Sequence, residues 1–379
     1  MNKHLLLLIV LIGLIVSAQK PENDFQNKKI VKLDSLYSSL YENGKFNGNV
    51  LIAENGVPIF EKSFGLANEN TRFQLTKNSV FNLASLTKQF TAAAIVILHK
   101  KGKLSYDDDF TKYLPELHFY KGITIKDLLI HQSGLPSYMA VMDQEWDKTK
   151  TATNQDVIKL FEKVKPSVLF QPKERLQYSN TGYVFLASII ERLSHDRYSN
   201  FLQQNIFNPL QMDATKVLFR HKDTIAFPAL TKAYISNHLN TKIEPQNLKT
   251  FDYVIYVDGV YGQGRLHATT PDLLKWDQAL YTNKIIDETD RKMIFSSYKT
   301  KVGQHTGYGF GWYISNRKPY GKIAFHSGGW PGYVTYVERH LDTNKTIIIL
   351  QNNSGSKIET PVENTRRILY GLEVKEKKI

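Results

Sequence analysis

Ser85 and Lys88 stand three residues apart at the start of an apolar segment that reads ASLTKQFTAAAIV. In a helix, residues at this spacing meet on the same face. A serine hydroxyl is a weak nucleophile until a base takes its proton, and a buried lysine with a lowered pKa can be that base. The N-terminus of a helix also provides backbone donors for a developing oxyanion. The pair therefore predicts covalent catalysis with Ser85 as the nucleophile.

The same Ser-x-x-Lys pattern occurs elsewhere in the chain, so the spacing alone is a weak signal. The other matches begin at Ser17, Ser296, Ser315 and Ser354. We assign Ser85 because it alone opens a long apolar helix. The alternative for Lys88 is a lysine whose ammonium group extends to solvent.

A second candidate group is the tripeptide YSN from Tyr178 to Asn180, on a loop before a predicted helix. A tyrosine that is ionised or hydrogen-bonded to the lysine can move a proton between the nucleophile and a leaving group. The amide of Asn180 can orient the lysine and a substrate carbonyl. The tripeptide recurs at Tyr198, inside an amphipathic segment, where we interpret the tyrosine as helix surface or core edge. We assign Tyr178 because catalytic groups are commonly presented on loops.

A third candidate group is the run HSGG that begins at His326, at the end of a predicted strand over 322–326. Gly328 and Gly329 allow a substrate backbone to approach closely, and an edge strand can bind a peptide-like substrate by strand addition. His326 can donate a hydrogen bond to the substrate. The alternative is a tight Gly-Gly turn beside an incidental histidine.

The elements that must position these residues are strands near both chain ends and helices between them. A turn signal at Asn55-Gly56 separates two strand-like segments, and helical patterns follow. The predicted strands are 49–54, 57–64, 308–315, 322–326, 334–339 and 346–351, and the predicted helices are 27–43, 85–101, 154–164, 181–194, 271–280 and 357–372. This order predicts an α+β fold, in which an antiparallel sheet built from both chain ends is flanked by helices and joined to an all-α subdomain.

The composition excludes several classes of protein. The 379 residues include no cysteine, which rules out disulfides, thiolate metal sites and cysteine nucleophiles. The formal net charge of +13 comes from scattered lysines without a nucleic-acid motif, so we expect a basic surface and no nucleic-acid partner.

The ends of the chain predict processing and export. Residues 1–18 combine a basic start, an apolar run and small residues up to Ala18, which is typical of a signal peptide cleaved near that residue. The alternative is an uncleaved anchor. We expect a domain over 30–370, a basic tail at 371–379, no stable membrane span, and a periplasmic or extracellular location.

The three groups, in this order, resemble the serine β-lactamase and penicillin-binding-protein superfamily. The resemblance is closest to its class C branch, which includes β-lactamase-like esterases, D-aminopeptidases and DD-peptidases. Three further segments are similar to the branch patterns LLxHxSGLP, IFxPLGM and GxGGLxSTxxDL; they are LLIHQSGLP at 128–136, IFNPLQM at 206–212 and GQGRLHATTPDL at 262–273. The resemblance covers about residues 30–370.

The resemblance implies a role for each candidate. Ser85 is implied to be acylated, with Lys88 as its base or hydrogen-bond partner. Tyr178 is implied to transfer protons, and Asn180 to orient. The backbone N–H groups of Ser85 and Gly329 are implied to form an oxyanion hole, and no metal or cofactor is implied.

Three positions depart from the family pattern. His326 stands where the family has the lysine of Lys-Thr-Gly, and a largely neutral histidine is a poorer partner for the carboxylate of a β-lactam. Pro172-Lys173 stands where the family often has Pro-Gly, and Gln263 replaces a small residue in the glycine-rich loop. The histidine places efficient β-lactamase activity below esterase or peptidase activity, Pro172-Lys173 bears on the shape of the loop before Tyr178, and the sequence assigns no effect to Gln263.

We therefore predict a secreted serine hydrolase that acts on an ester, an amide or a D-amino-acid peptide, with small-molecule or peptide substrates that include cell-wall fragments. The alternative is a non-catalytic penicillin- or peptide-binding protein of the same fold. Aromatic residues in the loops 136–153 and 236–262 either line the cleft or cover the core: Tyr138, Trp146, Tyr253, Tyr256 and Tyr261.

Overall fold

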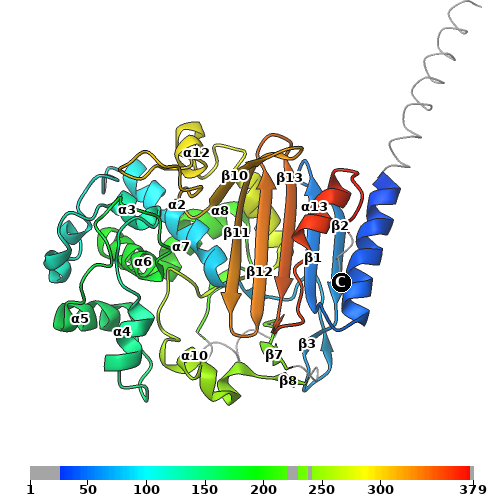
Figure 1. Ribbon diagram of the computed structural model, residues 1–379, viewed down its shortest axis with the longest axis horizontal. Helices are drawn as coiled ribbons and strands as arrows, with labels where there is room; N and C mark the ends of the chain where they lie inside the picture. Colours follow the sequence, from blue (N-terminus) through cyan, green and yellow to red (C-terminus); the bar gives the residue numbers. More distant parts are fainter. Residues whose placement is uncertain (1–25, 220–228, 238–240, 376–379) are drawn as a thin grey trace, which may run out of the picture.

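The computed structural model describes residues 26–219, 229–237 and 241–375; the predicted signal peptide at 1–18 and the last four residues of the tail lie outside this part. A six-stranded antiparallel sheet forms the centre, in the order β10-β11-β12-β13-β1-β2 (Figure 1). The strands are β1 Gly48–Glu54, β2 Val57–Phe64, β10 Tyr313–Arg317, β11 Gly321–Trp330, β12 Tyr333–His340 and β13 Lys345–Gln351. The sheet combines strands from both chain ends, as predicted.

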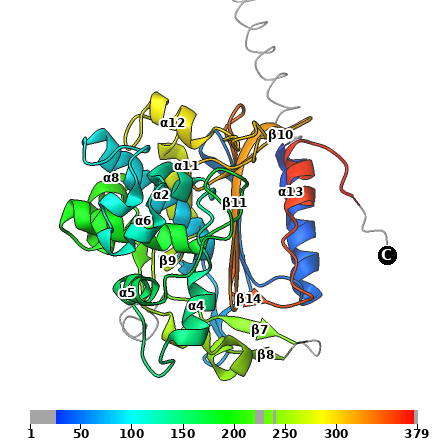
Figure 2. The same cartoon turned by 60° about the vertical axis from the view of Figure 1, so that its left-hand side comes forward.

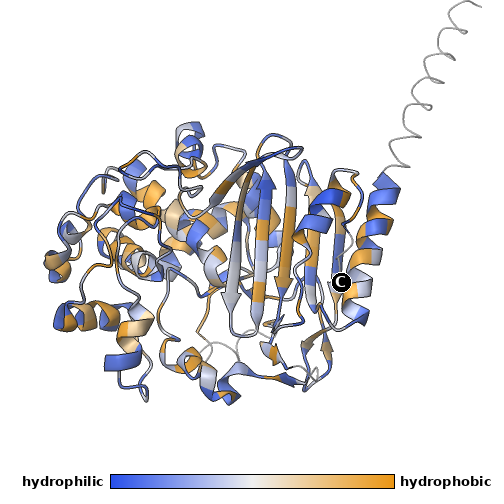
Figure 3. Cartoon of the chain, viewed as in Figure 1, coloured by the Kyte–Doolittle hydropathy of each residue, from blue (hydrophilic) through white to orange (hydrophobic). Residues whose placement is uncertain are grey.

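Hydrophobic strand segments place the sheet at the middle of the molecule. β1 (GNVLIAE) and β13 (KTIIILQ) pair along their whole length and are almost completely buried. Continuous apolar strands of this kind are covered on both faces. In Figure 3 the hydrophobic colour follows these central strands. The predicted hairpin between β1 and β2 is confirmed, with Asn55 and Gly56 both at positive φ, as a tight hairpin turn requires.

Helices of the middle of the chain cover one face of the sheet, and this is the side on which the candidate residues lie (Figure 2). α2 (Thr87–Lys100) is buried along twelve of its residues, and α11 (Thr270–Ala279) packs against β1 and β13. The other helices are α3 Ile125–Leu129, α4 Tyr138–Glu145, α5 Asn154–Val164, α6 Asn180–Ser194, α7 Tyr198–Leu202, α8 Asn208–Leu210, α10 Tyr253–Tyr256, α12 Glu288–Ile294 and α13 Val362–Leu369. The predicted mixture of helices and antiparallel sheet is confirmed.

Short strands join the helical part to the sheet. β5 pairs with β9, and β9 pairs with β6, so that the chain just before Ser85 is held beside the glycine-rich segment. The short strands are β3 Leu66–Asn68, β4 Phe73–Gln74, β5 Phe81–Asn82, β6 Lys216–Val217, β7 Tyr234–Ser236, β8 Lys242–Ile243, β9 Leu266–Ala268 and β14 Asn353–Ser354.

The opposite face of the sheet is covered by the helix at residues 26–42 and by α13 (Figures 1 and 2). An aromatic cluster fills this second core, with Tyr37 stacked on Phe60 and Phe64 and edge-on to Phe46. The two chain ends therefore close the sheet on the side away from the candidate site. Within the described ranges, no helix is both long and apolar enough to span a membrane.

Three predicted boundaries differ from the structure. The strand predicted at 308–315 begins only at Tyr313, because three glycines interrupt residues 307–311 and two of them, Gly307 and Gly311, adopt positive φ. The helix predicted at 357–372 is confined to Val362–Leu369. β11 continues past His326 to Trp330, and the turn follows at Pro331-Gly332. The Gly-Gly pair is therefore part of a strand, so the alternative of a Gly-Gly turn is wrong.

A buried ionic cluster ties α13 to β12 and makes stability pH-dependent. The guanidinium of Arg366 donates to both carboxylate oxygens of Glu338, at 2.8 and 2.6 Å, and His340 Nε2 lies 2.9 Å from the same carboxylate. Burial alone raises the pKa of Glu338, but the hydrogen bonds from Arg366 and His340 outweigh it and lower the pKa to about 2. The stabilising contribution of Glu338 is therefore complete above its unfolded pKa of 4.5, and it is lost as the pH falls from there through about 2.

Glu338→Gln is expected to lower the free energy of unfolding by about 3–5 kcal/mol at pH 7, because it removes the buried counter-charge of Arg366 and leaves only the pair with the partly exposed Glu363. Urea unfolding at pH 7 and at pH 3 measures the effect, and the difference from wild type should shrink at pH 3. Glu363→Gln is the matched control, since Glu363 pairs with the same arginine from a partly exposed position, and its loss should cost less than about 1 kcal/mol. Equal losses in the two variants would contradict this account.

Candidate active site

Ser85 lies in a single helical turn, η1 (Ala84–Leu86), which leads directly into α2. The turn is anchored by the side chain of Asn82, whose Oδ1 accepts the backbone N–H of Ala84 at 2.8 Å, and Ala84 itself has φ +48°. The turn packs beneath β11, where a Cβ on Gly328 would overlap the carbonyl oxygen of Leu83. Gly328 is therefore needed for the close approach of β11 to the turn that carries Ser85.

Lys88 is the most unusual residue of the site, because its side chain is fully buried and makes no ion pair with any described residue. Its Nζ lies 3.1 Å from Ser85 Oγ and donates to the backbone carbonyl of Gln263 at 2.8 Å. Burial holds the pKa of Lys88 well below its usual value of 10.5. The alternative of a lysine that extends to solvent is wrong. The lowered pKa favours the neutral amine, whose lone pair can accept a proton from the neighbouring serine hydroxyl.

Tyr178 reaches the same place from the loop before α6. Its ring centroid lies 4.8 Å from Lys88 Nζ, and the tyrosine and Ser85 line a common hollow. Burial raises the pKa of Tyr178 above its ordinary value of 10, and the nearby hydroxyl of Ser85 opposes this only in part. The buried hydroxyl of Tyr178 has no hydrogen-bond partner of ordinary geometry among the described residues. The phenol is therefore neutral and free to exchange a proton with a bound substrate.

His131 is a residue of the site that we did not predict, although it lies in the segment LLIHQSGLP. It is fully buried, has φ +58°, and packs its ring 4.2 Å from that of Tyr178. Its Nδ1 accepts the backbone N–H of Ser179 at 3.1 Å, and its carbonyl accepts that of Gln177. His131 thus fixes the backbone on both sides of Tyr178, through the N–H groups of Gln177 and Ser179. Burial, with smaller effects of Lys88 and His326, lowers the pKa of His131 well below 6.5.

His326 is also buried and neutral, but its ring is occupied by the protein. Nδ1 donates to the carbonyl of Ser327 at 2.6 Å, so Nε2 is the acceptor for the hydroxyl of Tyr308 at 3.1 Å. Burial and, less strongly, Lys88 lower the pKa of His326 to about 3. Sequence reasoning expected this residue to donate to a substrate. With both ring nitrogens engaged, His326 instead positions β11 and the surrounding aromatic rings.

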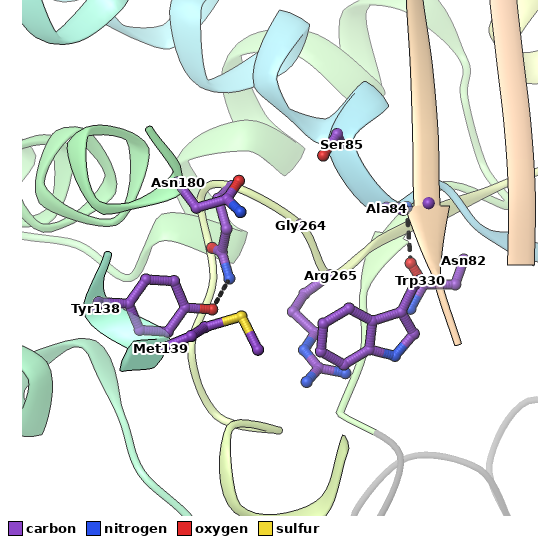
Figure 4. Close-up of a pocket in the computed structure, with 11 residues that line it drawn as sticks. Asn82, Ala84, Ser85, Tyr138, Met139, Asn180, Gly264, Arg265 and Trp330 are labelled. Carbon is purple, nitrogen blue, oxygen red and sulfur yellow. Dashed lines mark hydrogen bonds between the residues drawn. The ribbon is translucent and has the colours of Figure 1, made fainter. Parts of the chain in front are cut away.

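The remaining candidates border a cleft on either side of Ser85. Asn180 begins α6 and faces the cleft, and its Oδ1 is buried without a hydrogen-bond partner among the described residues. Gly329 is exposed, and a Cβ there would meet nothing within 4 Å. Figure 4 shows the Asn180 side of the cleft, with Tyr138 and Met139 opposite Arg265 and Trp330. This side is lined by Asn82, Ala84, Ser85, Tyr138, Met139, Asn180, Gln263, Gly264, Arg265, Gly329 and Trp330.

The structure accounts for two of the departures from the family pattern. Lys173 has φ +68°, the left-handed conformation that a glycine adopts readily, so the loop before Tyr178 keeps a glycine-like shape without glycine. Gln263 donates its side-chain amide to the hydroxyl of Tyr138 at 3.0 Å, while its backbone carbonyl holds Lys88. Gln263 thus links the lysine to the wall of the cleft.

The alternative tyrosine and the alternative serines lie elsewhere. Tyr198 is buried on α7, shares a hydrogen bond with Thr91 and stacks on Tyr261, which makes it a core residue. Ser296 donates to the carbonyl of Lys292, Ser315 accepts from Arg317, and Ser354 accepts from the backbone of Gly332; Ser17 lies outside the described residues. Of the aromatic loop residues, Tyr138 lines the cleft, Tyr253 packs edge-on to Trp330, and the others contact the core or the surface.

Gly262→Ala is expected to destabilise the fold by more than about 2 kcal/mol and to impair catalysis. Gly262 has φ +101°, and a Cβ would overlap the carbonyl oxygen of Tyr183 and lie 2.5 Å from Cβ of Ala187. The displaced loop would move the Gln263 carbonyl away from Lys88. Thermal unfolding and ester turnover measure both effects. Gly264→Ala is the control, since its nearest neighbour is 3.8 Å away; a melting temperature that falls equally in both variants would contradict the argument.

Comparison with known proteins agrees with this geometry. The family described as Beta-lactamase matches residues 33–372, so the chain belongs to this family of serine hydrolases, in the serine β-lactamase and penicillin-binding-protein superfamily. Penicillin-binding protein 4* of Bacillus subtilis is 41% identical over 328 residues, which are 86% of this chain and 72% of that protein. The putative penicillin-binding protein PbpX of the same organism is 28% identical over 343 residues, 89% of this chain and 77% of that protein.

Solved structures share the fold. The octameric penicillin-binding protein homologue from Pyrococcus abyssi has a TM-score of 0.77 at 25% identity and covers 91% of this chain and 78% of its own. The D-amino acid amidase from Ochrobactrum anthropi SV3, complexed with L-phenylalanine amide, has a TM-score of 0.73 at 22% identity and covers 92% and 99%. In the part of the chain that the structure describes, no cluster of three or more His, Asp or Glu side chains is arranged to hold a metal ion.

Proposed function

We propose that this serine hydrolase forms an acyl-enzyme on Ser85 and hydrolyses an ester, an amide or a D-amino-acid peptide bond. The observation that carries the proposal is the fully buried Lys88 amine, which lies 3.1 Å from Ser85 Oγ and has no counter-charge among the described residues. Burying an amine in this way is costly to folding. Such a cost is expected at a site that needs a neutral base.

The reaction follows from the positions of three side chains. Lys88 accepts the proton of Ser85, and Oγ forms a bond with the substrate carbonyl carbon while the carbonyl π-electrons move to oxygen. Tyr178 gives its proton to the leaving group as the bond to that group breaks, and recovers a proton from Lys88. Water then adds to the acyl-enzyme by the same route, which releases the acid and restores Ser85.

The developing oxyanion is assigned to the backbone N–H groups of Ser85 and Gly329, which border the same cleft. The open space beside Gly329 leaves room for a substrate at this point of β11. Asn180, with its unpartnered Oδ1, is placed to hold the acyl part of the substrate, and the N–H of an acylamino group would satisfy that oxygen.

The substrate ranking rests on the relatives and on His326. Two of the similar proteins described above are penicillin-binding proteins, and a D-amino acid amidase shares the fold. A neutral His326 with both ring nitrogens engaged is a poor partner for the carboxylate of a β-lactam. We therefore place esters and D-amino-acid amides or peptides above β-lactams, within the class C-like branch, and cell-wall fragments are the natural peptide candidates.

Location and boundaries complete the proposal. We assign residues 1–18 to a signal peptide, residues 30–370 to the hydrolase domain, and 371–379 to a basic tail. N-terminal sequencing of the protein from culture fractions tests this; a mature N-terminus near residue 19 in the periplasmic or extracellular fraction is expected, and an intact residue 1 there would contradict it.

The experiment that tests the function is a turnover panel on wild type and Ser85→Ala. An aryl ester, a D-amino-acid amide and benzylpenicillin are each incubated with both proteins, and intact mass is recorded with penicillin. Serine-dependent turnover of at least one compound, or a penicilloyl adduct on wild type that slowly disappears, supports the hydrolase. Reversible penicillin binding without turnover or adduct would favour the non-catalytic binding protein.

A further inference from the structure

The cleft has two sides, which the proposed chemistry assigns to the two halves of a substrate. Tyr178 is the group that protonates the leaving group, so the leaving group must lie on the Tyr178 side of Ser85. The acyl half then lies on the opposite side, between Tyr138 and Trp330 (Figure 4). The leaving-group side is lined by Ser85, Tyr178, Tyr313, His326, Ser327 and Gly329.

The leaving-group side presents no positive charge from any residue that lines it. Two of its side chains are phenols and one is the serine at 327, all neutral at pH 7. The one titratable cation candidate, His326, uses Nδ1–H for the carbonyl of Ser327 and Nε2 for Tyr308, and is only 1% exposed. It therefore has no N–H left for a substrate carboxylate.

The two cationic residues placed beside Ser85 and in the acyl side of the cleft, Lys88 and Arg265, are engaged elsewhere. Lys88 is fully buried, and its amine is already within hydrogen-bond distance of Ser85 Oγ, at 3.1 Å, and of the Gln263 carbonyl, at 2.8 Å. Arg265 lies on the acyl side, where its guanidinium stacks 4.7 Å from the Trp330 ring and pairs with the buried Asp258 at 2.9 Å. A carboxylate on the leaving group would meet no cation among the residues that line this side, so no ion pair would replace the water that it loses on binding, which is unfavourable.

We propose that the natural leaving group is uncharged next to the scissile bond. It is an alcohol, an amine or amide, or a peptide that continues, and it is not a residue with a free carboxylate. The inference rests on the proposed function and narrows its substrate class. The net reaction is the hydrolysis of R–CO–X by water to R–COOH and HX, in which HX leaves with the proton supplied through Tyr178 and X carries no charge.

The test compares two esters that differ only in this charge. 3-Carbamoylphenyl acetate and 3-carboxyphenyl acetate share their acyl group and release phenols of similar size. We expect kcat/KM, divided by the rate of hydroxide-catalysed hydrolysis of each ester, to be at least about tenfold higher for the carbamoyl ester. A smaller ratio, or a preference for the carboxylate, overturns the inference.

Variants of the pocket wall test the cause of the preference. Tyr313 is half-buried and stacks on Phe325 with ring centroids 5.4 Å apart, so an arginine there can keep the stacking while adding a cation. Tyr313→Arg is expected to reduce the ratio at least about threefold, whereas Tyr313→Phe keeps it. Ser327→Lys, at an exposed position of the same wall, is the second variant if Tyr313→Arg does not fold. An unchanged ratio in a folded cationic variant contradicts the inference.

The ester experiment gives different results when the proposed function fails and when only the inference about the leaving group fails. If wild type and Ser85→Ala hydrolyse both esters at the same background rate, the serine mechanism is wrong and the inference falls with it. If wild type hydrolyses both esters through Ser85 without preferring the neutral one, only the inference is wrong.

Discussion

Ser85→Ala is expected to reduce kcat/KM for an activated ester by at least about 10³-fold while leaving the fold intact. The proposal makes Ser85 Oγ the atom that becomes acylated, and among the described residues it is the hydroxyl that hydrogen-bonds Lys88 Nζ. The hydroxyl is hydrogen-bonded to Lys88 and lies near the hydroxyl of Tyr178, and it supports no other part of the described fold by its side chain, so its removal should cost little stability. Steady-state ester hydrolysis and thermal unfolding of the purified variant measure the two quantities.

The control for this variant is Ser296→Ala, which removes the serine of another Ser-x-x-Lys match. Ser296 donates to the carbonyl of Lys292 on the exposed end of α12, so its loss should leave turnover unchanged. Residual activity of Ser85→Ala above a tenth of wild type, or a melting temperature that falls by more than a few degrees, would contradict the assignment of Ser85 as the nucleophile.

Lys88→Met is expected to lower kcat by about 10³-fold or more with only a small change in stability. Methionine fills the same buried space but has no lone pair to accept the serine proton. The variant loses the hydrogen bond to the Gln263 carbonyl, which costs about 1–3 kcal/mol, but it also removes a buried amine whose desolvation opposes folding. These two effects have opposite sign, so the free energy of unfolding should change by less than about 2 kcal/mol.

The matched control is Lys100→Met, the same substitution on the same helix. Lys100 is exposed and pairs with Asp287 and Asp290, and its loss should not alter turnover. The pH profile adds a second readout. Because burial lowers the pKa of Lys88, its base form is present well below pH 10.5, and the wild-type rate should rise with pH through that lowered pKa and then level off. A Lys88→Met variant that keeps the wild-type rate would contradict the base role.

The parts of the fold that sequence could predict are those with a local physical signal. The apolar strands β1 and β13 and the Asn55-Gly56 turn carry such signals, and they define the sheet together with the strands around His326 and Val337. The apolar helix after Ser85 was likewise recognisable. The prediction of a buried Lys88 beside Ser85 rested on their helical spacing and on the apolar residues around them, and both are visible in the sequence.

Other features depend on contacts between distant segments. β11 runs four residues past His326 because β12 pairs with it up to Trp330, and a pair of glycines gives no sign of that pairing. His131 packs its ring against that of Tyr178, which lies 47 residues further along the chain. His131 also has a left-handed backbone conformation, which no local sequence pattern predicts. Nε2 of His326 is occupied because the hydroxyl of Tyr308 donates to it. The sequence predicted Tyr308 at the start of a strand and gave no sign that its side chain contacts His326. Each of these is a property of packing.

The central claim is that Lys88 makes Ser85 a nucleophile, and covalent labelling tests it most directly. Wild type, Ser85→Ala and Lys88→Met are incubated with a fluorophosphonate, and the modified peptide is identified by mass spectrometry. The account predicts one adduct per wild-type chain, on Ser85, none on Ser85→Ala, and strongly slowed labelling of Lys88→Met. An adduct on another serine, or a wild-type protein that stays unlabelled, would contradict it.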